Sequence, residues 1–179
     1  MLTKKRKKKI KKPHTSPLLK PKLIIITGTP GVGKTTLAKL LAKKMRYHRL
    51  DLHKHYAQIS TSYNKQKQCY NINYQKFQKL VQQQLQKQLR GLIIDSHITH
   101  LLPKSLVNVC IILTCSDLKL LKQRLTHRKY SKAKIQENLQ AELMQICLTQ
   151  AQQQKHHSIT YDTASQSPQQ ILTSLSKSL

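Results

Sequence analysis

Apolar residues along the chain fall into short runs that are separated by longer segments with helical periodicity. The short runs predict strands at 23–27, 49–52, 92–95, 107–114 and 158–162. The longer segments place apolar residues on one side of helices predicted at 36–45, 75–89, 118–125, 131–155 and from 168 onward. Segment 53–71 follows neither pattern, and we expect it to be polar and irregular. Apolar strands separated by helices are typical of a parallel sheet covered on both faces, so the pattern predicts an α/β fold.

The segment between the first strand and the first helix carries the pattern Gly, four residues, Gly-Lys-Thr, beginning at Gly28. Glycines in such a loop let successive N–H groups turn inward, and the positive end of the helix dipole adds to their attraction for phosphate. The motif is a P-loop, in which Lys34 would reach the β- and γ-phosphates and the Thr35 hydroxyl would serve Mg²⁺. Three of the chain's four glycines lie in this loop, which argues against a chance match.

Only six acidic residues occur in the chain, and Asp95 ends one of the predicted buried strands. The carboxyl ends of parallel strands face the ligand crevice, where a carboxylate can hold Mg²⁺ as the Walker-B acid does. The alternative is an aspartate that caps the following turn. His97, two residues further on, is either a residue that orients water or phosphate or an incidental loop histidine.

Arg124 and Arg128 lie four residues apart at the end of a predicted helix, just before a polar loop. Two guanidinium groups on one face suit the charge of a transferring phosphoryl group, because each can bind two phosphate oxygens. In a chain with so many basic residues the alternative is a solvated helix face. The histidine pairs at 53/55 and 156/157 lack cysteine or acidic partners at the spacing of zinc ligands, and we expect no zinc site.

The strong positive charge of the chain bears on which partners it can bind. The chain has 33 basic and 6 acidic residues, a formal net charge of +27. Residues 1–21 are lysine-rich and broken by prolines, and they predict a disordered tail in which Lys4–Lys9 is a nuclear address, a nucleic-acid arm or a solvated segment. The positive electrostatic field of the chain favours non-specific RNA binding. The alternative is that all proteins of the same lineage share this basic composition, in which case the charge would not indicate a partner. With no Trp and one Phe, specific base recognition is not indicated.

The remaining composition predicts one intracellular domain over residues 22–179. The four cysteines form no C-x-x-C pair, so buried free thiols in a reducing compartment are expected. No apolar run is long enough to span a membrane, and the first residues contain no apolar signal core. The expected location is the cytoplasm, or the nucleus if the basic run is an address.

Four motifs occur in order along the chain: the P-loop at 28–36, Asp-Ser-His at 95–97, R-x-x-x-R-x-Y from Arg124, and N-x-x-A-E from Asn138. Together they resemble the adenylate kinase isoenzyme 6 family over about residues 22–175. The resemblance implies a P-loop kinase fold of three layers with a five-stranded parallel sheet. It also implies an acceptor-nucleotide region at about 51–74 and a short lid at about 127–137.

The resemblance implies an adenylate kinase-type enzyme that phosphorylates AMP with Mg²⁺ and ATP, has ATPase activity, and takes part in small-subunit rRNA maturation. The alternative is an ATP-hydrolysing assembly factor that binds pre-ribosomal RNA or a ribosomal protein and has little kinase turnover. The implied ATP-binding residues are Gly31, Gly33, Lys34, Thr35, Thr36 and Arg128. Taken with the arginine spacing and the P-loop motif, the candidate catalytic residues are Lys34, Asp95, His97, Arg124 and Arg128, and the candidate metal-binding residues are Thr35 and Asp95.

Two departures from the family pattern concern the lid and the acceptor. Lys129 stands where the family usually has glycine, which predicts a stiffer lid hinge. The segment from Leu50 to Leu89 contains no arginine for the acceptor phosphate. That role would fall to Lys54, Lys65 or Lys67.

Overall fold

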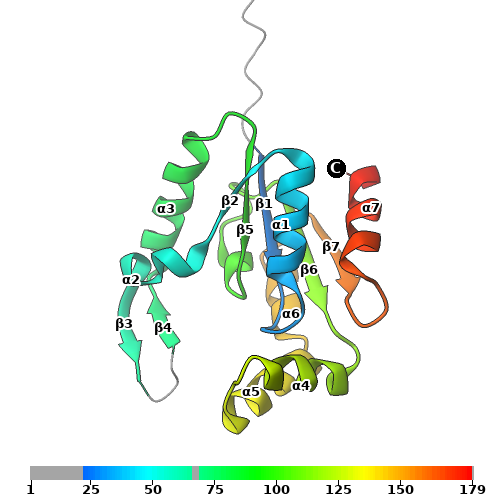
Figure 1. The fold of residues 1–179 in the computed structure, drawn as a ribbon. Coiled ribbons are helices and arrows are strands. Elements are labelled where there is room, and N and C mark those ends of the chain that lie inside the picture. Colours follow the sequence, from blue (N-terminus) through cyan, green and yellow to red (C-terminus); the bar gives the residue numbers. More distant parts are fainter. Residues whose placement is uncertain (1–21, 66–68, 179) are drawn as a thin grey trace, which may run out of the picture.

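The computed structural model of the protein describes residues 22–65 and 69–178. The predicted disordered tail at 1–21 lies outside these residues. The centre of the fold is a five-stranded parallel sheet with the strand order β2-β5-β1-β6-β7 (Figure 1). The strands are β1 (Lys22–Thr27), β2 (His48–Leu50), β5 (Gly91–Asp95), β6 (Val109–Thr114) and β7 (Ser158–Asp162). The predicted α/β class and the five parallel strands are confirmed.

Alternate residues of β1 enter two separate apolar cores. Ile24 and Ile26 pack into the core on one face of the sheet, whereas Leu23 and Ile25 pack into the core on the other. Because helices cover both faces, the strand is buried from Leu23 to Thr27. This two-sided burial explains why its sequence is uniformly apolar rather than alternating.

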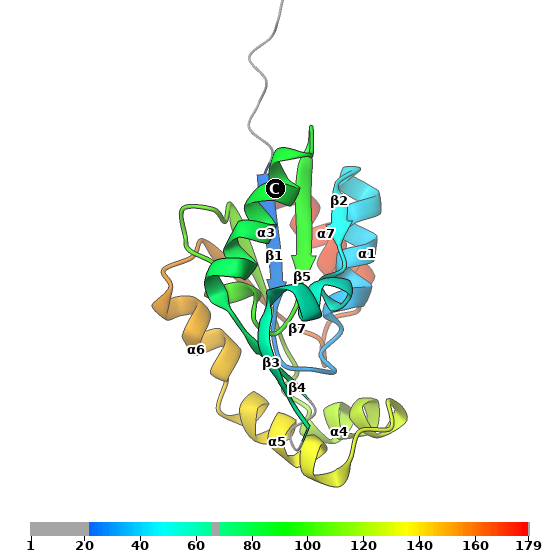
Figure 2. The same ribbon diagram turned by 90° about the vertical axis from the view of Figure 1, so that its left-hand side faces the viewer.

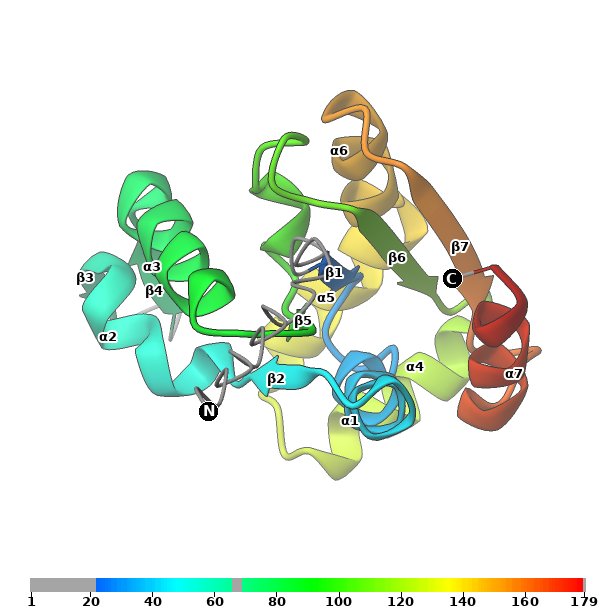
Figure 3. The ribbon, with the colours of Figure 1, turned by 90° about the horizontal axis from the view of Figure 1, so that it is seen from above.

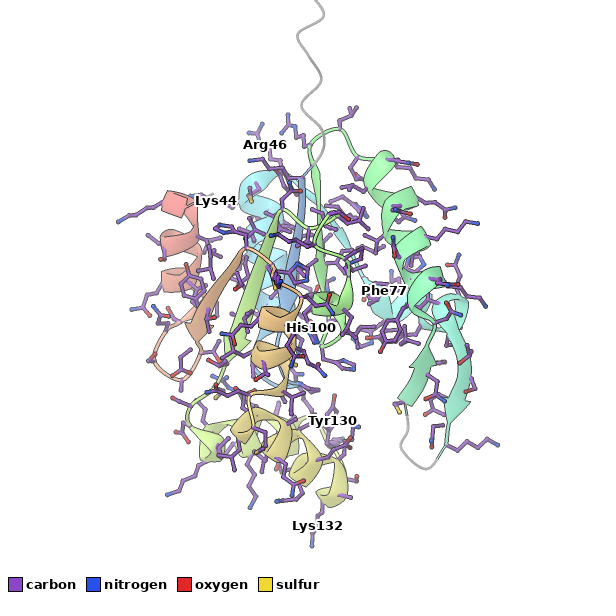
Figure 4. The ribbon with its side chains drawn as sticks, turned by 180° about the vertical axis from the view of Figure 1, so that it is seen from behind. Lys44, Arg46, Phe77, His100, Tyr130 and Lys132 are labelled. Carbon is purple, nitrogen blue, oxygen red and sulfur yellow. The ribbon has the colours of Figure 1, made fainter. Side chains whose placement is uncertain are left out.

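Helices cover the sheet in two layers, as Figures 2 and 3 show. On one face lie α1 (Lys34–Met45) and α7 (Pro168–Ser178), which contribute Leu37, Leu41, Ile171 and Leu175 to the first core. On the other face lie α3 (Tyr74–Gln86) and α6 (Ile146–Gln153). Phe77 points from α3 toward the sheet in Figure 4 and belongs to the second core.

The remaining elements lie near the carboxyl ends of the strands (Figure 1). One group is the helix pair α4 (Leu118–His127) and α5 (Lys132–Leu143), whose N-termini are capped by Asp117 and Ser131. The other group follows β2 and precedes α3. It contains the short helices η1 (Leu52–His55) and α2 (Tyr56–Ile59) and the antiparallel hairpin of β3 (Ser60–Asn64) and β4 (Cys69–Ile72). A further short helix, η2 (Thr99–Leu101), follows β5.

The prediction of one long helix at 131–155 is wrong, because the structure contains two helices there, α5 and α6. Gln145 adopts a left-handed backbone conformation with φ 49°, which ends the first helix and redirects the chain. Leu143 and Ile146, predicted to be buried, are 67% and 41% exposed. The apolar periodicity continues through the break, so nothing in the pattern marks it.

The prediction that 53–71 is irregular is also wrong, since the segment contains η1, α2, β3 and most of β4. Its strands are largely exposed, and therefore they lack the apolar alternation that reveals a strand. The predicted helix at 75–89 ends at Gln86 instead, and Leu89 is 86% exposed. The four cysteines are free, with Cys110 and Cys115 buried as expected. Among the described helices, none has the length and apolar character needed to cross a membrane.

Candidate functional site

The loop between β1 and α1 has the backbone that a P-loop requires. Gly31 and Gly33 both have φ 96°, a left-handed conformation that side chains with a Cβ resist. A Cβ on Gly31 would also lie 2.8 Å from the Leu121 side chain of α4. Because α1 begins at Lys34, the N–H groups of Lys34 and Thr35 have no carbonyl one turn earlier in the helix and are available to an anionic ligand, whereas the N–H group of Thr36 donates to Gly33 O at 3.1 Å.

Lys34 folds back over this loop. Its Nζ donates to the carbonyl oxygens of Gly28 at 2.7 Å and Thr29 at 2.8 Å. Burial lowers the pKa of the Lys34 amine to about 8, an effect that the nearby charge of Asp95 partly offsets. The amine is still mostly protonated at pH 7 and provides a positive charge at the mouth of the loop.

Asp95 lies beside the P-loop because β5 pairs with β1, with Asp95 opposite Ile26. Its Oδ2 accepts a hydrogen bond from the Thr35 hydroxyl at 2.7 Å, and the residue is only 5% exposed. The alternative that Asp95 caps the following turn is wrong, since its hydrogen bonds come from other segments of the chain. A hydroxyl and a carboxylate oxygen in this arrangement are hard oxygen ligands of the type that Mg²⁺ prefers, so the residues present fit the ion.

The other oxygen of Asp95 binds a residue that sequence reasoning did not identify. Arg49 Nε donates to Asp95 Oδ1 at 2.7 Å, and the Arg49 side chain is 16% exposed. Arg49 NH1 also lies 4.0 Å from Asp51 Oδ2. The interaction joins the end of β2 to the end of β5, two strands whose pairing the sequence did not establish.

His97 lies on the exposed surface just after Asp95. The pKa of its imidazole is lowered to about 4, first by desolvation and then by the positive charge of Lys34. His97 is therefore neutral at pH 7. A neutral imidazole beside the P-loop can donate or accept a hydrogen bond without adding charge.

Arg124 and Arg128 line the same pocket beside the P-loop but differ in their surroundings. The guanidinium of Arg124 donates from NH1 to Thr163 Oγ1 and from NH2 to Thr163 O, both at 3.1 Å. Arg128 is the exposed C-terminal capping residue of α4, and its charge is close enough to lower the pKa of Lys34. Arg124 is therefore anchored to the loop after β7, whereas Arg128 is the more accessible of the two.

The pocket has a volume of about 480 Å³ and opens against the P-loop. Its wall combines the P-loop and Thr36 with the end of α4 and with residues 163–168 between β7 and α7. The loop at 163–168 was not recognised in the sequence, since its composition of small and polar residues is that of an ordinary connection. Only the parallel pairing of β7 with β6 brings it to the P-loop.

Lys129 has φ 58°, a left-handed conformation that favours glycine. This explains structurally why glycine suits the position in the related family. Tyr130, the next residue, lies at the edge of the α4–α5 pair nearest the β3–β4 hairpin in Figure 4. The segment predicted as a lid thus contains a residue in a strained backbone conformation directly after Arg128.

The remaining candidate residues fall into two groups. Glu137 is exposed and pairs with Lys134 at 2.9 Å. Glu142 is instead buried and accepts a hydrogen bond from the Cys115 N–H at 2.6 Å, which fixes α5 to the end of β6. Lys54 and Lys65 are exposed, and Lys67 lies outside the described residues. In the part of the chain that the structure describes, no three His, Cys, Asp or Glu residues form a metal cluster.

The sequence matches a family model described as an AAA domain over residues 24–145. A Schizosaccharomyces pombe protein named adenylate kinase isoenzyme 6 homolog is 33% identical over 161 residues, which span 86% of this chain and 87% of that protein. A Pyrococcus abyssi protein, provisionally named an adenylate kinase, is 34% identical over 157 residues, which span 84% of this chain and 79% of that protein.

Solved structures share the fold. The YorR protein of Bacillus subtilis in complex with phosphorylated GDP superimposes with a TM-score of 0.56 at 18% identity, over 87% of this chain and 94% of that one. The deoxyadenosine kinase of M. mycoides with bound dATP superimposes with a TM-score of 0.52 at 17% identity, over 87% and 98% of the two chains. At such identities the likeness concerns the arrangement of sheet and helices.

Proposed function

Because the chain belongs to the adenylate kinase isoenzyme 6 family, we propose that it transfers the γ-phosphoryl group of ATP to AMP and releases two ADP. The observation that carries the proposal is the hydrogen bond of 2.7 Å between the P-loop hydroxyl of Thr35 and the carboxylate of Asp95. It joins the two parts of a nucleotide kinase site that lie 60 residues apart in the sequence.

ATP is the phosphoryl donor in this proposal. Its β- and γ-phosphates accept hydrogen bonds from the N–H groups at the start of α1, and Lys34 moves from the loop carbonyls to the phosphates. The pocket of about 480 Å³ beside Thr36 receives the nucleoside, and Arg128 at its edge binds the phosphates from the opposite side. Arg124 keeps the loop at 163–168 in place through Thr163.

Mg²⁺ fits between Thr35 and Asp95, which would hold it directly or through water. When it is bound with ATP, the ion would neutralise part of the negative charge of the phosphates. Thr35 can keep its hydrogen bond to Asp95 while a lone pair of its hydroxyl oxygen faces the ion, so the observed contact is compatible with metal binding.

The acceptor approaches from the side of η1, α2 and the hairpin. A phosphate oxygen of AMP attacks the γ-phosphorus of ATP, and the bond from that phosphorus to the bridging oxygen breaks, so both products are ADP. A phosphate oxygen is already ionised near pH 7, and no side chain needs to remove a proton. The protein therefore acts by positioning both phosphates and by balancing their charge. Neutral His97 and the guanidinium of Arg128 would contact the transferring group.

A second candidate function is an ATP-driven assembly factor that binds pre-ribosomal RNA or a small-subunit ribosomal protein. Two observations favour it: the net charge of +27 and the absence of arginine from Leu50 to Leu89. In this case ATP would be hydrolysed without AMP, and hydrolysis would switch the binding of the partner. Both candidates use the same P-loop and differ in the acceptor of the phosphoryl group.

Replacing Lys34 tests the donor site. Lys34→Ala should reduce nucleotide turnover by roughly 10²-fold or more, on the scale of losing one preorganised charge, while the fold remains intact. The matched control is Lys39→Ala, which removes an exposed lysine from the same helix. Turnover is measured by resolving ATP, ADP and AMP after incubation with and without AMP, and folding is measured by thermal denaturation.

The expected result is loss of both AMP phosphorylation and ATP hydrolysis in Lys34→Ala and nearly unchanged rates in Lys39→Ala. Equal rates in Lys34→Ala and the unmodified protein would show that the loop does not bind the reacting phosphates. ADP formation that requires AMP favours the kinase, whereas phosphate release that is independent of AMP favours the assembly factor.

A further inference from the structure

Four aromatic rings contact one another in series next to the candidate site. His53 contacts Tyr56 with ring centroids 5.1 Å apart, Tyr56 contacts Tyr70 at 5.8 Å, and Tyr70 contacts Tyr63 at 4.9 Å. The rings come from η1, α2, β4 and β3, so the series crosses from the end of β2 to the face of the hairpin. We call these four residues the aromatic ladder.

The second ring of the ladder, Tyr56, contacts the candidate site. The Tyr56 hydroxyl is 3.0 Å from Ser96 Oγ, and Ser96 follows Asp95 directly. At the outer end, Tyr63 and Tyr70 are opposite each other in the register of the β3–β4 hairpin. This pairing holds both outer rings on the same side of the hairpin.

The outer rings are not core residues. Tyr63 is 49% exposed and Tyr70 is 39% exposed, although both are large aromatic side chains. Burial in the cores therefore does not explain their placement. Exposed rings that are held by cross-strand and ring contacts offer flat faces to a ligand at little cost in conformational entropy.

The charge around the ladder favours an anionic ligand. No acidic residue occurs between Asp51 and Asp95 in the sequence, and of the lysines in that interval Lys54 and Lys65 are those nearest to ladder residues. Lys54 follows His53 directly, Lys65 lies two residues after Tyr63, and both lysines are exposed. Rings for stacking in a positive field are the two components of single-stranded nucleic acid sites.

We propose that the aromatic ladder binds single-stranded RNA, with successive bases stacked on the exposed rings and the backbone phosphates attracted by the surrounding lysines. The series extends beyond what the single base of AMP can cover, which favours a polynucleotide over a mononucleotide. The inference goes beyond the proposed kinase and does not depend on AMP phosphorylation. It adds a structural element to RNA binding that net charge alone would make non-specific.

The position of the ladder has a consequence for the acceptor. Because Tyr56 lies beside Ser96 and Asp95, an RNA strand that covers the inner rings would occupy the side from which AMP approaches. RNA bound to the ladder should therefore raise the KM for AMP and leave the affinity for ATP unchanged.

Fluorescence anisotropy with a labelled single-stranded RNA of about 12 nucleotides tests the ladder, using the full-length chain. Tyr63→Ala and Tyr70→Ala should each weaken binding about fivefold or more, the effect of losing one stacked base. Tyr63→Phe keeps the ring and should bind within about twofold of the unmodified protein. The matched control is Tyr74→Ala, since Tyr74 is 57% exposed on α3 and has no ring contact within the described residues.

All variants keep the basic residues of the chain, so the non-specific electrostatic attraction is common to them. Double-stranded RNA of the same length is the second probe, and its binding should not respond to the tyrosine variants because its bases are already stacked. A direct readout is tyrosine fluorescence, which stacked bases quench. Quenching by the single strand should fall in a Tyr63→Phe/Tyr70→Phe double variant that still binds it.

Equal affinities of Tyr63→Ala, Tyr70→Ala and Tyr74→Ala for the single strand would overturn the proposal, and the charge alone would then account for binding. Unchanged RNA affinity with a raised KM for AMP in the ladder variants would also overturn it and would assign the rings to the acceptor base. Thermal denaturation of each variant identifies any loss of folding, and the phenylalanine variants keep the test decisive if an alanine variant unfolds.

Discussion

At the scale of single residues, the carboxylate of Asp95 is shared between two partners. Thr35 donates to one oxygen and Arg49 to the other, each at 2.7 Å. Arg49 and Asp95 are both largely buried, so removing either leaves a charge without its partner. The guanidinium of Arg49 balances part of the negative charge of Asp95. If Asp95 holds Mg²⁺ as proposed, binding of the ion and the ion pair to Arg49 would therefore be coupled.

Lys129 gives a prediction about backbone strain. Its left-handed conformation disfavours a residue with a Cβ, so Lys129→Gly should raise the free energy of unfolding by up to about 1 kcal/mol. The matched control is Lys122→Gly at an exposed position inside α4, which should lower it by about 1 kcal/mol. Chemical denaturation measures both. If the two glycine variants destabilise the protein alike, the conformation at Lys129 is not strained.

At the scale of elements, a buried histidine of η2 connects β1 to α6. His100 in η2 is 1% exposed, and its Nδ1 lies 2.7 Å from Thr27 Oγ1 at the end of β1. Its Nε2 lies 2.8 Å from Gln150 Oε1 of α6, which must accept the proton. The ring therefore accepts from Thr27 through Nδ1, and the neutral imidazole holds the strand that leads into the P-loop. In Figure 4, which views the molecule from the back of Figure 1, His100 lies beside α6.

The His100 contact predicts acid sensitivity. Burial lowers the pKa of His100 below its value of about 6.5 in the unfolded chain, so the unfolded state binds more protons at acidic pH. The contribution of His100 to the free energy of unfolding is therefore complete above about pH 6.5. It is lost as the pH falls from there toward the pKa of His100 in the folded protein.

The variant His100→Gln isolates this contribution. It should lower the free energy of unfolding by about 1–3 kcal/mol at neutral pH, because Thr27 loses its buried acceptor. Its stability should also fall less steeply than that of the unmodified protein between about pH 7 and pH 5.5, since the titrating group is gone. Thermal denaturation across this range checks the slopes. Identical slopes would exclude His100 as a source of the acid sensitivity.

The sequence predicted those elements whose local pattern reflects their surroundings. Strands buried on both faces, such as β1 and β5, are uniformly apolar, and the P-loop has a fixed glycine spacing. The hairpin lacks such a pattern because its residues are largely exposed, and the break at Gln145 has neither glycine nor proline to mark it. The contact of Arg49 with Asp95 could not be predicted from the sequence, because it depends on the neighbouring positions of β2 and β5.

At the scale of the whole molecule, two groups of elements lie on opposite sides of the P-loop, at the carboxyl ends of the sheet strands. The helices α4 and α5 and the loop after β7 stand on one side of the P-loop, where the pocket of about 480 Å³ lies. The η1–α2 segment and the hairpin, with the aromatic ladder, stand on the other (Figure 1). Under the proposed function, this division would provide one side for the phosphoryl donor and one for the acceptor, with Lys34 and Asp95 between them.

Transfer of a labelled γ-phosphoryl group from ATP to unlabelled AMP tests the proposed kinase most directly. The unmodified protein should place the label in the β-phosphate of ADP in proportion to the AMP consumed. Asp95→Asn should slow this transfer by roughly 10²-fold, the scale of losing one preorganised electrostatic group. Asp117→Asn, the same substitution at the cap of α4, should leave it unchanged, because asparagine also caps helices. Label that appears only as inorganic phosphate, whether or not AMP is present, would contradict the kinase function.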